Sequence, residues 1–158
     1  MPKSYSPLKK DLWTLEHAST LSYLDVGTKD PIEANDTYLL DLNGWEGVSV
    51  SEWWEFEEAY RQVRTCDYVN EDPLAIDWDG FLNQYFEDSI VGYLSLNVST
   101  QADVILANIL PHRVFNCVTV KHGGQSDYRD SIRGVLKVGC YHPHRIDVEG
   151  VDFWLRTN

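Results

Sequence analysis

The spacing of the apolar residues changes along this chain, and this change limits its fold more than any other sequence feature. Residues 77–88 carry apolar side chains at the i, i+3, i+4, i+7 and i+8 positions of an amphipathic helix. The C-terminal third instead alternates apolar and polar residues at period two, as half-buried strands do. By these criteria we predict helices at residues 8–24, 51–66, 77–88 and 100–110, and strands at residues 37–42, 91–98, 113–121, 131–141 and 145–156.

Helices that precede most of the strands favour an α+β fold over repeated βαβ units. The chain has 158 residues, enough for one domain with a sizeable core, and no linker rich in Pro, Gly or Ser divides it. We therefore expect a single domain, residues 1–158, with helices packed on a mostly antiparallel sheet that includes a C-terminal three-strand meander.

The sequence carries no signal for export or membrane insertion. No apolar stretch of signal-peptide length follows the N-terminus, and no window approaches the ~18 apolar residues of a membrane helix. The cysteines Cys66, Cys117 and Cys140 are too few and too widely spaced for a disulfide framework. We expect a soluble, cytoplasmic protein.

The charges are distributed unevenly along the chain, whose formal net charge is −12. Residues 30–90 hold sixteen acidic and two basic residues, whereas residues 111–158 hold seven basic and five acidic ones. Such a chain repels phosphates, so we do not expect it to bind nucleic acid directly. Rows of carboxylates on helices can instead imitate the phosphate rows of a duplex. The shortage of balancing lysines favours a role for this charge beyond solubility, because self-repulsion destabilises the fold.

On this basis we predict a non-enzymatic inhibitor or adaptor whose acidic helical surface occupies a basic, nucleic-acid-binding groove on a partner protein. The partner would be a basic protein, such as a nucleic-acid-binding or nucleic-acid-cleaving enzyme, and a homodimer is also compatible with the sequence. Phage- and plasmid-encoded anti-defence proteins and nuclease-immunity proteins share this acidic composition, an analogy of class alone. The predicted contact residues lie off the apolar stripes of two helices or between them: Glu52, Trp54, Glu55, Glu58, Glu71, Asp72, Asp79, Glu87 and Asp88.

The sequence contains neither a P-loop nor a G-x-G-x-x-G motif, and we predict no catalytic residue, cofactor or metal site. The alternative is a small hydrolase or transferase with a Cys/His site near Cys140 and His142. Cys117, His122 and His144 are further candidates for that cluster, but Pro143 favours a turn there and no standard zinc spacing is met. In a third interpretation the acidity serves solubility alone.

Overall fold

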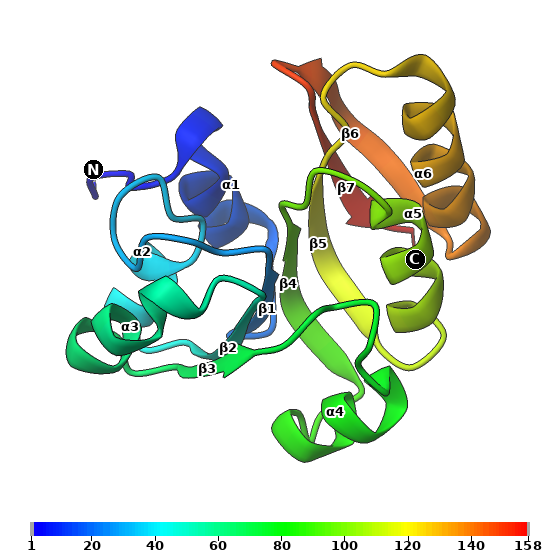
Figure 1. Cartoon of the computed structure of the whole chain (residues 1–158). Coiled ribbons are helices and arrows are strands. Elements are labelled where there is room, and N and C mark those ends of the chain that lie inside the picture. Colours follow the sequence, from blue (N-terminus) through cyan, green and yellow to red (C-terminus); the bar gives the residue numbers. More distant parts are fainter. Residues whose placement is uncertain (1, 158) are drawn as a thin grey trace.

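The computed structural model describes residues 2–157, which contain one seven-stranded sheet with helices on both faces (Figure 1). The order across the sheet is β3-β2-β1-β4-β5-β7-β6. Neighbouring strands from β3 to β5 are parallel, whereas β7 is antiparallel to both β5 and β6. The strands are β1 (Ser22–Val26), β2 (Glu46–Ser51), β3 (Asp67–Asn70), β4 (Ile90–Leu96), β5 (Val114–Lys121), β6 (Tyr141–Val148) and β7 (Val151–Arg156).

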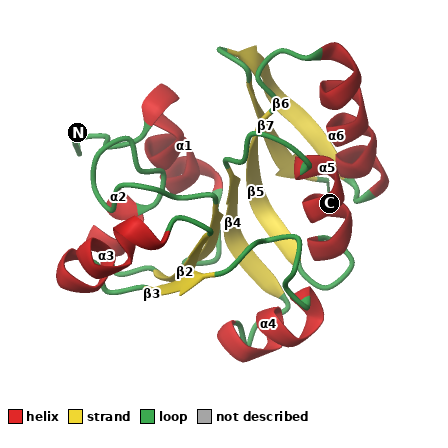
Figure 2. Ribbon diagram, viewed as in Figure 1, coloured by secondary structure: helices red, strands yellow, loops and turns green. Residues whose placement is uncertain are grey.

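α-Helices cover both faces of this sheet (Figure 2). One face carries α1 (Lys10–His17), α2 (Tyr38–Leu42) and α3 (Glu57–Val63). The other carries α4 (Trp78–Tyr85), α5 (Ala102–Ile109) and α6 (Ser126–Val138). Two short 3-10 helices, η1 (Pro7–Lys9) and η2 (Trp54–Phe56), precede α1 and α3. The helices alternate with the strands along the chain, which is the connection pattern of a parallel sheet.

The core has two parts because the central strands are buried on both faces. Leu24, Leu94 and Val118 point toward α4, α5 and α6, whereas the neighbouring residues Tyr23 and Tyr93 point toward α1 and α2. Successive strand residues face opposite sides of a sheet, so a strand covered on both sides needs apolar residues at consecutive positions. This explains why a search for apolar and polar alternation does not identify β1.

The predicted mostly antiparallel sheet with a C-terminal meander is wrong. Residues 131–141, predicted as a strand, fall largely in α6, which buries Ile132 and Leu136 against the sheet. These two residues and Val138 are separated by even numbers of positions, so the segment also satisfies strand alternation. In the helix, however, Val138 is 86% exposed. α6 thus forms a crossover from β5 to β6, and β6 runs in the same direction as β5 with β7 between them.

The N-terminal half differs from prediction in further places. Residues 8–24 divide into η1, α1 and β1, and residues 37–42 form α2 rather than a strand. The helix predicted from residue 51 starts only at η2, since Ser51 is the last residue of β2, and β3 was not predicted. The helices predicted at 77–88 and 100–110 and the strands at 91–98 and 113–121 are confirmed as α4, α5, β4 and β5. Within residues 2–157, no helix has the length and apolar character needed to cross a membrane.

Candidate functional site

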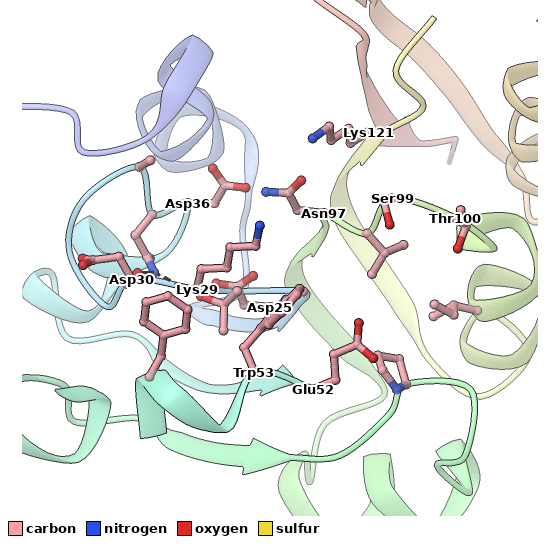
Figure 3. A pocket seen from close by; sticks show the side chains of 18 of the residues that line it. Asp25, Lys29, Asp30, Asp36, Glu52, Trp53, Asn97, Ser99, Thr100 and Lys121 are labelled. Atoms are coloured by element: carbon pink, nitrogen blue, oxygen red, sulfur yellow. Dashed lines mark hydrogen bonds between the residues drawn. The ribbon is translucent and has the colours of Figure 1, made fainter. Parts of the chain in front are cut away.

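A cavity of about 720 Å³ opens at the carboxyl edge of the parallel strands (Figure 3). It lies over the ends of β1 and β4, neighbouring strands from which the chain continues toward opposite edges of the sheet. In open α/β sheets this reversal of strand order leaves a crevice outside the carboxyl ends, where ligands bind. The position of the cavity in the fold marks it as the candidate functional site.

Gly27 brings three strand ends close together beside this cavity. Its N–H donates to the carbonyl oxygen of Val50 at 2.8 Å, and the N–H of Asn97 donates to the carbonyl oxygen of Val26 at 2.9 Å. Gly27 has a φ of +89°, and a Cβ there would overlap the main-chain oxygen of Asn97. The close approach of β1 and β4 therefore requires glycine at this position.

Buried Arg64 holds the loop that connects β1 to α2. Its guanidinium donates to Asp41 at 2.6 Å, to the side-chain oxygen of Asn35 at 3.1 Å and to Thr37 at 3.0 Å. Asn35 also donates to the hydroxyl of Tyr60 at 2.7 Å. These bonds fix the loop against α3 without a second glycine, and several loop residues line the cavity.

Asp25 is a buried carboxyl group that lines the cavity and is 2% exposed. Thr37 donates to one of its oxygens at 2.9 Å, and no donor within residues 2–157 is hydrogen-bonded to the other. Burial and the nearby Asp36 carboxylate raise the pKa of Asp25 to about 7. Asp36 itself accepts hydrogen bonds from three groups: Ser6, Lys10 and Ser95. Unlike Asp36, Asp25 therefore has a carboxyl oxygen that is free to accept a hydrogen bond from a ligand.

The ends of β2 and β3 supply the opposite wall. Glu52 directly follows β2, and Asp72 and Leu74 follow β3. Trp53 also lines the cavity, and the ammonium of Lys29 lies 5.2 Å from its ring centroid. In dinucleotide-binding sheets, an acid about 20 residues beyond the first glycine hydrogen-bonds the ribose hydroxyls. Glu52 occupies the corresponding place at the end of β2.

Carboxylates outnumber ammonium groups in the cavity lining, which contains Asp25, Asp30, Glu33, Asp36, Glu52 and Asp72 but only the bases Lys29 and Lys121. This surplus favours a ligand with positive charge and disfavours the pyrophosphate of a dinucleotide. The first helix after β1 is the five-residue α2, which begins only at Tyr38. Pyrophosphate binds where a glycine-rich turn leads directly into a helix, and the described loop between β1 and α2 does not have this arrangement.

Two of the nine predicted contact residues, Glu52 and Asp72, line this cavity. The other seven lie outside its lining, on η2, α3, α4 and the adjacent loops: Trp54, Glu55, Glu58, Glu71, Asp79, Glu87 and Asp88. Trp54 is 70% exposed and so is not a core residue. Contact of this surface with a basic protein stays a prediction.

Among the described residues, the group of three or more potential metal ligands does not include Cys140 or His142, the residues of the alternative Cys/His site. Cys140 is exposed just before β6, whereas Cys117 is buried in β5, where burial raises the pKa of its thiol to about 12. His142 is 3.1 Å from the hydroxyl of Thr157, and His144 accepts a hydrogen bond from the indole of Trp13. None of these groups lines the cavity.

A cluster at the end of β5 contains buried His122, exposed Asp147 and buried Asp152, whose side chains have the types and proximity of metal ligands. The guanidinium of Arg133, however, lies 2.7 Å from Asp152 and 3.0 Å from Asp147. His122 forms a bond of 3.1 Å with Asp152, and its other ring nitrogen accepts from the N–H of Gly124. Because an arginine already supplies the positive charge, we interpret this cluster as a structural network.

No protein-family model and no curated protein matches this chain. Solved structures do match its fold. A putative rRNA methylase from Clostridium thermocellum is 13% identical with a TM-score of 0.61, covering 98% of this chain and 95% of its own. A TehB-like S-adenosylmethionine-dependent methyltransferase from Corynebacterium glutamicum is 9% identical with a TM-score of 0.60, covering 94% and 88%. Human methyltransferase-like protein 13, in complex with S-adenosylhomocysteine, is 15% identical with a TM-score of 0.55, covering 94% and 76%.

The comparisons show a Rossmann-like methyltransferase fold with a seven-stranded, mostly parallel sheet. They also contradict the prediction of a non-enzymatic inhibitor that imitates nucleic acid, because these structural neighbours are methyltransferases. The anti-defence interpretation is therefore also wrong, and the transferase alternative agrees better with these findings. The cavity lining includes neither Cys140 nor His142, the residues assigned to that alternative. The overlooked signal was the run Leu24-Asp25-Val26-Gly27, a buried strand that ends in glycine, which the prediction of a helix at 8–24 obscured.

Proposed function

We propose that this protein is a methyltransferase that uses S-adenosylmethionine. The observation that carries the proposal is the cavity at the β1–β4 reversal, with Glu52 at the end of β2 and a surplus of carboxylates around it. S-adenosylmethionine combines a nucleoside with a positively charged sulfur and an amino-acid end that carries an ammonium and a carboxylate group, so its net charge is positive. An acidic cavity with an acid placed for ribose hydroxyls matches that chemistry.

The residues present fit this ligand in three places. Glu52 would accept hydrogen bonds from the ribose hydroxyls. The free oxygen of Asp25 would accept from the ammonium group, a charge-assisted bond stronger than a neutral one. The apolar residues of the lining would cover the adenine: Pro73, Leu74, Val98 and Ile105.

S-adenosylmethionine, when bound, supplies a methyl group whose bonding electrons remain with sulfur as the lone pair of an acceptor bonds to the methyl carbon. The chain's own contribution is to position the reactants and to exclude water. The end of β4 lies beside Asp25, and the side chain of Asn97 extends from it into the cavity (Figure 3). We assign the acceptor to this part of the cavity because the ribose and ammonium sites occupy the parts next to β2 and β1.

Isothermal titration calorimetry with S-adenosylhomocysteine tests the proposal. We expect binding to the intact protein, and about tenfold weaker binding after Glu52→Gln, which removes a charged hydrogen-bond acceptor. Glu58→Gln is the matched control, because Glu58 is an exposed acid on α3 outside the cavity lining. The absence of binding, or preferential binding of NAD⁺, would overturn the proposal.

We also propose a cytoplasmic location for the protein. All three cysteines, Cys66, Cys117 and Cys140, are free, and reducing compartments preserve free thiols. Immunofluorescence or fractionation of the native host tests this location, and recovery of the protein from an exported fraction would contradict it.

A further inference from the structure

The charges that line the cavity are divided between its two sides. All six carboxylates belong to β1 or to the segments that follow β1, β2 and β3. The side formed by the ends of β4 and β5 has one lysine and no carboxylate among its lining residues: Asn97, Val98, Ser99, Thr100, Gln101 and Lys121. Because β4 separates β5 from β1 in the sheet, Lys121 lies across the cavity from Glu52 (Figure 3).

Lys121 is the lining base without an internal partner among the described residues. Lys29, the other lining base, has its ammonium over the ring of Trp53. No ion pair or side-chain hydrogen bond to another residue within 2–157 engages Lys121. Asp36, a buried carboxylate of the lining, already accepts from Ser6, Lys10 and Ser95. The positive charge of Lys121 therefore remains available to a ligand.

The network around His122 holds the end of β5 in place. The N–H of His122 donates to the carbonyl oxygen of Gly150 at 2.8 Å, and its side chain bonds Asp152 in β7. Asp152 in turn accepts two hydrogen bonds from Arg133 of α6. Lys121 directly precedes this fixed residue and pairs with Val151 in the sheet, so its backbone position at the cavity is well defined.

We infer that the methyl acceptor binds at the ends of β4 and β5 and carries an oxyanion, a carboxylate or a phosphate group, that pairs with Lys121. The inference rests on the proposed function, which assigns the sides next to β1, β2 and β3 to S-adenosylmethionine. Neutral donors and acceptors on Asn97, Ser99 and Thr100 would surround the rest of the acceptor. An ammonium opposite a carboxylate or phosphate is a charge-assisted contact, and the carboxylate-free wall would not repel such an anion.

Two-dimensional ¹H–¹⁵N NMR of the protein, saturated with S-adenosylhomocysteine, tests this inference with two separate probes. Sodium acetate and inorganic phosphate are titrated at constant ionic strength. We expect saturable shifts of the backbone amides of Ser99, Thr100 and Lys121, and about tenfold weaker binding in Lys121→Gln. Lys137→Gln is the control, since Lys137 is an exposed lysine of α6 outside the cavity. A response to acetate alone specifies a carboxylate, and a response to phosphate alone specifies a phosphate group.

Failure of this inference is distinguishable from failure of the proposed function. If S-adenosylhomocysteine binds but neither anion shifts these amides, the proposed function stands and the oxyanion assignment is wrong. Equal anion binding by the native protein and Lys121→Gln would also overturn the assignment. If S-adenosylhomocysteine does not bind, the proposed function fails, and the same anion titrations on the free protein still report whether Lys121 holds an anion.

Discussion

Replacement of Asp25 by Asn should stabilise the protein and weaken its ligand binding at the same time. The pKa of Asp25 is raised from 3.8 to about 7, first by burial and then by Asp36. Its ionisation therefore costs more in the folded than in the unfolded state. The stability linked to this group is complete below pH 3.8 and is lost as the pH rises toward 7. Thr37 can still donate to the Asn side-chain oxygen, so the substitution retains the hydrogen bond of 2.9 Å.

The size of the effect follows from the two pKa values. A pKa shift of about 3 pH units destabilises the folded state by about 4 kcal/mol at pH 8, where Asp25 is ionised in both the folded and the unfolded state. At pH 5 the destabilisation is about 2 kcal/mol. We expect Asp25→Asn to be more stable than the native protein by amounts that decrease in this way between pH 8 and pH 5. Urea unfolding of both proteins at each pH measures the difference, in which contributions from groups that do not interact with Asp25 cancel.

Ligand binding provides the second half of this test. The affinity of the native protein for S-adenosylhomocysteine should fall as the pH drops below about 7, because protonated Asp25 no longer attracts an ammonium group. Asp25→Asn should bind weakly and show a flatter pH profile. A stability difference that does not change between pH 8 and pH 5 would refute the burial argument. Unchanged affinity in the variant would refute the assignment of Asp25 to the ligand.

The remaining predictions concern the loop and surface around the site. Gly27→Ala places a Cβ against the Asn97 backbone at positive φ, so we expect a loss of about 3 kcal/mol in urea unfolding and loss of S-adenosylhomocysteine binding in calorimetry. Arg64→Met leaves the buried carboxylate of Asp41 without its ion-pair partner and should lower the free energy of unfolding, measured with urea, by about 3–5 kcal/mol. The double variant that also carries Asp41→Leu should regain part of that stability. Trp54→Ala should change stability by less than about 0.5 kcal/mol and leave ligand binding intact, because Trp54 is 70% exposed; a larger loss would show that its indole packs on the protein.

The spacing of apolar residues correctly predicted those elements whose spacing fits a helix or a strand but not both. The segment 77–88 carries a helical stripe that no strand could bury on one face, and α4 forms there with Trp78 and Leu82 in the core. The segment 131–141 was ambiguous, because the same apolar positions satisfy both periods. Packing decided in favour of α6, which covers the sheet with Ile132 and Leu136.

The surplus of acidic residues was evident from the sequence, but the gathering of some of them around one cavity was not. The sequence placed the excess charge on helix surfaces, and Glu52 and Asp72 were among the chosen residues. The structure brings these two together with Asp25, Asp30, Glu33 and Asp36 around one cavity. Asp25 was not identified as a functional residue, because the helix predicted at residues 8–24 took in the first three of the five residues of β1.

By itself, the sequence determined where charge accumulates and where the strongly periodic helices and strands lie, since both depend on residues that are near neighbours along the chain. The tertiary structure alone decided strand direction and order, which depend on pairings between distant segments and on burial of both sheet faces. That order places β1 beside β4 and so creates the cavity, which is lined by Asp25 of β1, Glu52 directly after β2 and Lys121 of β5. No local sequence pattern predicts this proximity, because these residues come close together only when the parallel sheet has formed.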